Sequence, residues 1–197
     1  MPDNPTPKHY KSVDPESQKN QNEYQAMIDS IEKRMNPDSN TVLIVDDDKG
    51  IRKFVARSIR RSTKNIVTYE AENGQEGLEM LADMRERYSH DPLFIVTDLN
   101  MPVMDGWKFI QELRKDYVSK GLEQGIPVIV LSSTSGEKGM AIFRKSVHGE
   151  KSHYQPMVAV AKEVCTNPDQ YTARGEKGLV AWIRQFSRHG NDTLFDV

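Results

Sequence analysis

The chain has 197 residues with a formal net charge of −2, which is long enough to bury one good core but gives no basic footprint for nucleic acid. No apolar run approaches membrane-spanning length, and the N-terminus lacks the apolar core of a signal peptide. The single cysteine, Cys165, excludes an internal disulfide and favours a reducing cytoplasm. The five histidines match no familiar zinc-ligand spacing.

The first 39 residues are interpreted as an N-terminal extension. Residues 1 to about 15 are rich in Pro, Asn, Lys and Asp, and this composition predicts disorder. Between about residues 16 and 35, one apolar stripe recurs at three- and four-residue steps on a polar helix (Tyr24, Ile28, Ile31 and Met35). Such a stripe needs a partner surface, which is either the chain's own domain or a second protomer in a homodimer.

Apolar strand-like runs alternate with amphipathic segments along the rest of the chain. The strand-like runs lie at residues 41–45, 66–70, 94–97, 126–131 and 157–161. Helical apolar spacing is found over about 51–59, 78–88, 109–117, 137–147 and 179–186. The first of these helices carries basic residues, Arg52 among them, which we expect on its outer faces. The pattern predicts an α/β domain over residues 40–190, with a parallel sheet covered on both faces, and a tail at 191–197.

Acidic and hydroxyl side chains directly follow several of these strands. Asp46 and Asp47 follow the first strand, Asp98 follows the third and Ser132 the fourth. Because right-handed crossovers place the carboxyl ends of parallel strands at one edge, the fold gathers these side chains there. Bare carboxylates in one place repel one another, and an oxygen-only ligand set with open water positions suits Mg²⁺.

Such a site is suited to phosphoryl chemistry. A bound cation would screen an incoming phosphoryl group, and Asp98 could then attack phosphorus in line to form an acyl phosphate. Ser132, together with Lys162 after the fifth strand, could grip the phosphoryl oxygens.

Four stretches, taken in this order, resemble a response-regulator receiver domain. They are Val45–Asp47, residues 71–81, the run Thr97–Gly106, and residues 126–133. The resemblance covers about residues 40 to 133 well and 134 to 190 loosely. It implies the flavodoxin-like fold of the chemotaxis regulators, a doubly wound parallel sheet of five strands in the order 2-1-3-4-5.

The resemblance also implies two-component signalling, in which Asp98 accepts phosphate from a phosphohistidine on a sensor histidine kinase or a histidine phosphotransfer protein. Asp47 and Asp98 would bind Mg²⁺ directly, and Asp46 would help through water. Asn100 would contribute its backbone carbonyl to the same cation.

By the same resemblance, Ser132 would contact the phosphoryl group and Lys162 would pair with it. Asp48 falls where the family varies and is expected to be solvated, whereas Asp105 is interpreted as turn chemistry. Modification of Asp98 would switch a surface that a downstream protein or output domain reads, so the chain is not expected to be a metabolic enzyme. Whether it stands alone or belongs to a longer protein is left open.

Two departures from the family pattern affect the last third. The family's lysine is usually followed by proline, but Lys162 is followed by Glu163. A competing alignment uses residues 154–156, which keeps the proline but puts Gln155 in place of the lysine. The family often has an aromatic switch residue three positions before the lysine, where this chain has Ala159.

Two other functions remain as alternatives. A degenerate receiver could act as a phosphorylation-independent binding module, particularly if Gln155 occupies the lysine position. The second alternative is an aspartate phosphatase of the haloacid-dehalogenase type, since Asp46–Asp48 contains a D-x-D after an apolar strand. Gly50 departs from that family's preferred Thr or Val, no late acidic pair follows, and the Asp98 turn is left unexplained.

Overall fold

The structure is a computed structural model that describes residue 29 and residues 38–63, 65–133, 153–165 and 178–187. Its core is a five-stranded parallel sheet in the order β2-β1-β3-β4-β5. The strands are β1 (Thr41–Val45), β2 (Val67–Ala71), β3 (Phe94–Asp98), β4 (Val128–Ser132) and β5 (Met157–Ala161). The predicted α/β class and strand order are therefore confirmed. The predicted helices at 16–35 and 137–147, the loop at 166–178 and the tail lie outside the described residues, except for residue 29, which is helical, and residue 178.

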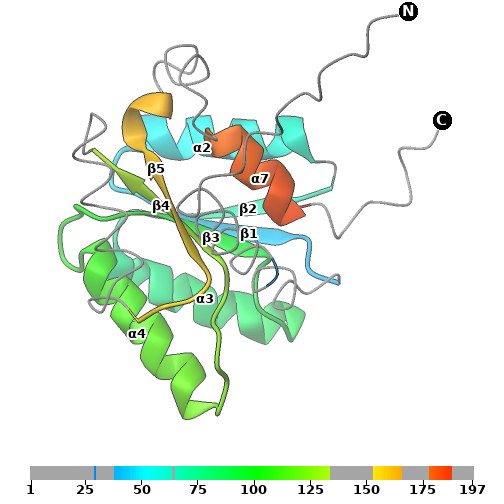
Figure 1. Cartoon of the computed structure of the whole chain (residues 1–197), viewed down its shortest axis with the longest axis vertical. Helices are drawn as coiled ribbons and strands as arrows, with labels where there is room; N and C mark the ends of the chain where they lie inside the picture. The colour runs from blue at the N-terminus through cyan, green and yellow to red at the C-terminus, as the bar shows by residue number, and fades with distance from the viewer. Residues whose placement is uncertain (1–28, 30–37, 64, 134–152, 166–177, 188–197) are drawn as a thin grey trace, which may run out of the picture.

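Helices cover both faces of the sheet (Figure 1). One face carries α2 (Lys49–Ser62) and α7 (Leu179–Ser187), and the other carries α3 (Gly74–Tyr88) and α4 (Gly106–Ser119). A short 3-10 helix, η1 (Lys162–Cys165), continues directly from β5. None of the helices in the described part of the chain combines the length and the apolar composition that crossing a membrane requires.

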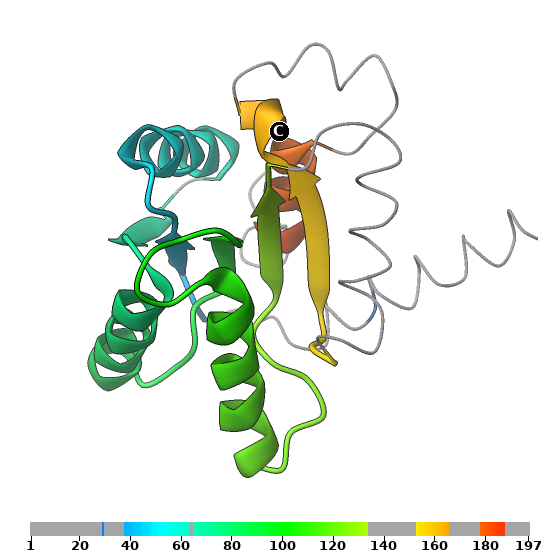
Figure 2. The same ribbon diagram turned by 90° about the vertical axis from the view of Figure 1, so that its left-hand side faces the viewer.

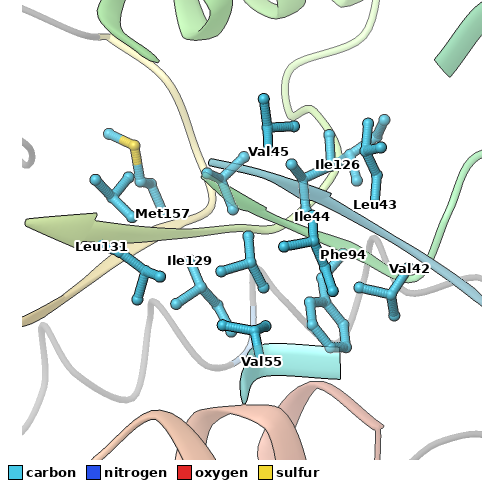
Figure 3. Close-up of a cluster of buried hydrophobic side chains, with 14 of the residues drawn as sticks. Val42, Leu43, Ile44, Val45, Val55, Phe94, Ile126, Ile129, Leu131 and Met157 are labelled. Carbon is cyan, nitrogen blue, oxygen red and sulfur yellow. The ribbon is translucent and has the colours of Figure 1, made fainter. Parts of the chain in front are cut away.

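The central strands read as continuous apolar runs because helices bury them on both sides. All five residues of β1 and of β3 are buried. Figure 3 shows Val55 of α2 and the ring of Phe94 on the side of the sheet that α2 and α7 cover. Phe94 also meets Phe186 of α7 edge to face, with 5.6 Å between ring centroids. This packing ties the last described helix to the centre of the sheet.

Two strands begin later than the apolar pattern predicts. The run at 126–131 becomes a strand only from Val128, because Pro127 has no N–H to donate to a ladder. The run at 66–70 is displaced by one residue, to Val67–Ala71. Neither shift changes which of the predicted site residues lie at the carboxyl edge of the sheet.

Candidate functional site

The carboxyl edge of the sheet brings together three of the predicted acidic residues. Asp46 comes directly after β1, Asp47 follows it, and Asp98 is the last residue of β3. Each offers a carboxylate oxygen, and these oxygens all lie within 4.8 Å of one another. Asp46 and Asp98 are buried, whereas Asp47 is exposed. The cluster therefore has two fixed inner carboxylates and one that reaches solvent.

Lys162 is the cation of this cluster. It is the first residue after β5, which lies beside β4 and points the same way (Figure 2). Its Nζ atom lies 2.9 Å from Asp98 Oδ2 and donates to Asp46 Oδ1 at 3.1 Å. Gln155 precedes β5 and so lies at the opposite end of that strand. The placement therefore favours Lys162 over Gln155 as the partner of Asp98.

Asp46 is held on several sides without any exposure to solvent. Its Oδ1 atom also accepts a hydrogen bond from the Asp48 N–H at 2.9 Å. Its Oδ2 atom lies 3.0 Å from Lys162 Nζ as an ion pair but accepts no hydrogen bond of good geometry. Burial raises the pKa of Asp46, and the Asp48 N–H and the Lys162 ammonium offset this only in part.

The ammonium of Lys162 stays charged in this setting. Burial alone would lower the pKa of Lys162, but the hydrogen bonds to Asp98 and Asp46 and their charges outweigh it, so the pKa is raised. A permanently charged ammonium between two buried carboxylates balances part of their charge and leaves the cluster negative.

The chain returns close to Asp98 through the loop that follows it. Asp98 Oδ1 accepts a hydrogen bond from the Leu99 N–H at 2.7 Å, and the Gly106 N–H donates to the Leu99 carbonyl at 3.0 Å. A Cβ atom at position 106 would overlap the Asp98 carbonyl oxygen, so only glycine fits there. Asp105 caps α4 by accepting from the Lys108 N–H at 2.7 Å, in keeping with its interpretation as turn chemistry.

The other predicted residues lie around the same edge. Asn100 and Asp48 are exposed, and Asp48 also caps α2 by accepting from the Gly50 N–H at 2.6 Å. The hydrogen bonds that Asp48 accepts from the Ile51 and Gly50 N–H groups lower its pKa. Ser132 is the last residue of β4 and stands in register with Ala161 of β5.

Arg52 corrects one expectation from the sequence, because it is buried rather than on an outer face of its helix. Its Nη1 atom donates to the carbonyl oxygens of Asp46 at 2.7 Å and Asp47 at 3.2 Å. Its Nε and Nη2 atoms pair with Glu70 at 3.3 Å and Glu72 at 2.7 Å. The two glutamates around the end of β2, the strand beside β1, are the sequence signal that could have indicated a buried partner.

The donor set fits a hard divalent cation. Asp46, Asp47 and Asp98 supply only oxygen ligands, and among the described residues Lys162 is the cation that pairs with two of them, Asp46 and Asp98. Such a cluster still carries excess negative charge, and Asp47 opens toward water, which a cation such as Mg²⁺ keeps in part of its coordination sphere. The residues present can therefore hold Mg²⁺ and receive an anionic group beside it.

Comparison with known proteins agrees with this geometry. Among curated proteins, the chain is 32% identical over 96 residues to the protein-glutamate methylesterase/protein-glutamine glutaminase of Geobacillus kaustophilus. It is 35% identical over 96 residues to the KDP operon transcriptional regulatory protein KdpE of Escherichia coli. Each alignment covers 49% of this chain, but 24% of the first relative and 36% of the second. The chain thus spans between a quarter and about a third of the length of these relatives.

A solved two-component response regulator from Cytophaga hutchinsonii shares the fold, with 17% identity and a TM-score of 0.50. That match covers 76% of this chain and 95% of the other. The family described as response regulator receiver domain matches residues 42–147, which is more than half of the chain. With the strand order and the gathered carboxylates, this match shows that the chain belongs to the response-regulator receiver domain family of two-component signalling.

Proposed function

We propose that this chain is a phosphorylation-controlled switch whose phosphoryl acceptor is Asp98. The observation that carries the proposal is the position of the Lys162 ammonium, 2.9 Å from Asp98 Oδ2. The carboxylates of Asp46 and Asp47 share the same edge, within 4.8 Å of that of Asp98. An acceptor, a cation for phosphoryl oxygens and a ligand set for a metal thus lie in one place.

The proposed metal is Mg²⁺, held directly by Asp47 and Asp98, through water by Asp46, and by the backbone carbonyl of Asn100. When bound, the ion screens the charge of an incoming phosphoryl group and offsets the repulsion among the carboxylates. The exposure of Asp47 and Asn100 supports this assignment, because it leaves room for water and for the phosphoryl group.

In the proposed reaction, a carboxylate oxygen of Asp98 attacks phosphorus in line and forms an O–P bond. The P–N bond to the imidazole of a phosphohistidine breaks, and its electron pair stays on the nitrogen. Lys162 Nζ already bridges Asp98 and Asp46, so it can exchange a carboxylate contact for a phosphoryl oxygen with little movement. Ser132, at the end of β4, is proposed to donate its hydroxyl to another of these oxygens.

The proposed donor is a sensor histidine kinase or a histidine phosphotransfer protein in the cytoplasm, and the proposed reader is a downstream protein or an output domain. Modification would favour one of two conformations of the surface that the reader binds. Ala159, in the middle of β5, is half-buried and has no ring to act as an aromatic relay. We therefore propose that Lys162, which begins η1, rather than position 159, transmits the change at Asp98 to the surface that the reader binds.

Two observations weigh against the phosphatase alternative. The receiver-domain family model spans both Asp46 and Asp98. The second acid of the D-x-D, Asp48, uses its carboxylate to cap α2. The position of Lys162 beside Asp98 likewise weighs against a degenerate binding module.

The test is intact mass after incubation with acetyl phosphate and Mg²⁺. We expect one phosphoryl adduct on the wild type, none on Asp98→Asn, and an unchanged adduct on Asp105→Asn, a nearby exposed carboxylate that keeps its capping ability as asparagine. No adduct on the wild type would contradict the switch and favour a binding module. An adduct that survives in Asp98→Asn but is lost in Asp46→Asn would favour the phosphatase.

A further inference from the structure

We infer that Arg52 is a positioning residue, which sets the conformation of the acid loop (Asp46–Asp48) so that Asp47 can bind the divalent cation. The inference rests on the proposed function, because it concerns the cation site that this function uses. Arg52 itself pairs with two backbone carbonyls and with Glu70 and Glu72 at the end of β2, so it would act on the cation only through the loop.

The first step of the argument is where Arg52 holds the chain. Its Nη1 atom donates to the carbonyl oxygens of both Asp46 and Asp47. These two carbonyls belong to the peptide groups on either side of the Asp47 Cα atom. Fixing both groups restricts the two backbone dihedrals of Asp47 and thereby the direction in which its exposed carboxylate points.

The rest of the acid loop is held by other bonds. The Asp48 N–H donates to Asp46 Oδ1 at 2.9 Å, and the Asp46 N–H donates to the Ala71 carbonyl of β2 at 3.1 Å. Asp48 is fixed in turn as the cap of α2. These contacts hold the neighbours of Asp47, and Arg52 completes the loop by holding the peptide groups between them.

The positive charge of Arg52 is paired with two glutamates and not with the carboxylates of the acid loop. Its side chain is 5% exposed, and its Nε and Nη2 atoms pair with Glu70 and Glu72. These carboxylates neutralise the guanidinium, so it does not cancel the negative potential that a cation requires. Only arginine offers five donors in a planar fork, which lets one side chain serve two carbonyls and two carboxylates together.

A positioning role and a purely electrostatic role of Arg52 therefore predict opposite changes in cation affinity when Arg52 is replaced. If Arg52 acted on the cation through its charge, Arg52→Met would tighten binding, because a positive group would leave the neighbourhood of the acid cluster. If it acts by positioning Asp47, the same change weakens binding although the local charge becomes more negative. A role in folding alone would lower the melting temperature and leave affinity for Mg²⁺ unchanged.

The experiment is a calorimetric titration of the full chain with Mg²⁺ alone, with melting temperatures measured in EDTA to separate loss of fold. We expect Arg52→Met to weaken Mg²⁺ binding by about tenfold or more, the effect typical of losing a group that orients a metal ligand. Arg52→Lys keeps the charge but not the fork, so it should bind Mg²⁺ more weakly than the wild type and more tightly than Arg52→Met. Arg57→Met, the same charge change at an exposed position of α2, should stay within about twofold.

Unchanged or tighter binding in Arg52→Met, or wild-type affinity in Arg52→Lys, would overturn the inference while leaving the proposed function standing. If Arg52→Met does not fold, Arg52→Lys is sufficient to test the inference. An electrostatic role predicts unchanged Mg²⁺ affinity for this variant, because it keeps the charge. A wild-type chain that binds no Mg²⁺ would overturn both the inference and the metal site of the proposed function.

Discussion

The carboxyl edge of the sheet and the opposite edge, at the amino ends of the strands, carry similar charged side chains in different proportions. At the carboxyl edge, the described residues bring three carboxylates together, and one ammonium, that of Lys162, pairs with two of them. At the opposite edge, a paired cluster matches two carboxylates with two cations. The members of this paired cluster are Arg85, Asp91, Asp116 and Lys120. The balanced set needs no further ion, whereas the unbalanced set retains negative charge that a divalent cation can neutralise.

Contacts at the paired cluster are short and direct. Arg85 lies 2.6 Å from Asp91 and 2.8 Å from Asp116, which also pairs with Lys120 at 2.9 Å. Burial alone would lower the pKa of Arg85, but the two carboxylates outweigh it and the pKa is raised. Beside the cluster, the Tyr154 hydroxyl donates to the Ile126 carbonyl at 2.7 Å. The comparison teaches that the two ends of the sheet differ in the proportion of their charges, and the proposed cation site lies at the unbalanced end.

The largest expected effect comes from adding a methyl group to a glycine at each edge. In Gly106→Ala the new Cβ would overlap the Asp98 carbonyl and lie 2.8 Å from the Leu99 Cα, which are backbone atoms that cannot move aside. In Gly125→Ala it would meet the hydroxyl of Tyr154 and the ring of Tyr117, which are the far ends of side chains rather than backbone. We expect losses in the free energy of unfolding of about 3 kcal/mol or more for the first and about 1–2 kcal/mol for the second, measured by urea denaturation. A larger loss of stability in Gly125→Ala than in Gly106→Ala would contradict the expectation that the surroundings of position 106 yield less than those of position 125.

Mg²⁺ should raise the free energy of unfolding by binding at the carboxyl edge and not at the paired cluster. At a free concentration of one hundred times its dissociation constant, a ligand that binds only the folded state adds about 2.7 kcal/mol to the free energy of unfolding. We expect this gain in the wild type and in Asp116→Asn, but little of it in Asp47→Asn. Urea denaturation in Mg²⁺ and in EDTA measures it, and equal gains in Asp47→Asn and wild type would place the ion elsewhere.

Removing one lysine from each edge comes next in size. Lys162→Met leaves the buried carboxylates of Asp46 and Asp98 without their cation, and we expect a loss of about 2 kcal/mol in EDTA. Lys120→Met removes an ammonium whose side chain is 48% exposed, so its loss should stay below about 0.5 kcal/mol. Denaturation of both variants in EDTA checks this, and equal losses would mean that the two edges are held in the same way.

The smallest expected effect is a pH dependence at the paired cluster. Burial alone would raise the pKa of Asp116, but Lys120 and Arg85 outweigh it, so the pKa is lowered in the folded state. The stabilisation from Asp116 is therefore complete above its unfolded pKa of about 3.9 and disappears as pH falls through the lower folded value. We expect Asp116→Asn to lose less than about 1 kcal/mol at pH 7, since the pair is partly open to solvent.

Urea denaturation of Asp116→Asn and wild type over a series from pH 7 to about pH 3 measures this difference. The two curves should converge toward the acid end. A difference that stays constant or widens on acidification would contradict the pairing of Asp116 with Arg85 and Lys120.

Much of the site could be predicted because it lies where apolar runs end. Asp46 and Asp98 close two buried strands, and a parallel sheet leaves little choice about the edge they share. The choice between Lys162 and Gln155 depended on where β5 ends, since a lysine and a glutamine on opposite sides of one short strand lie at opposite edges. The one-residue displacement of β2 had no such consequence, because that strand contributes no residue to the predicted site.

Arg52 could not be placed from sequence in the same way. It adjoins the buried Ile51, and apolar spacing along a helix says little about a charged residue beside its buried stripe. Two of its partners are backbone carbonyls, which a sequence does not display. The other two are Glu70 of β2 and Glu72, which directly follows that strand, so the contact follows from the register of β1 and β2 and not from any local motif.

The most direct measurement is the position of the acyl phosphate itself. After incubation with acetyl phosphate and Mg²⁺, borohydride reduction converts an aspartyl phosphate to homoserine, and peptide mapping by mass spectrometry locates it. The account predicts homoserine at position 98, with none at 46 or 47 and none when Mg²⁺ is replaced by EDTA. Homoserine at position 46 or 47, or at position 98 to the same extent in EDTA, would contradict the account.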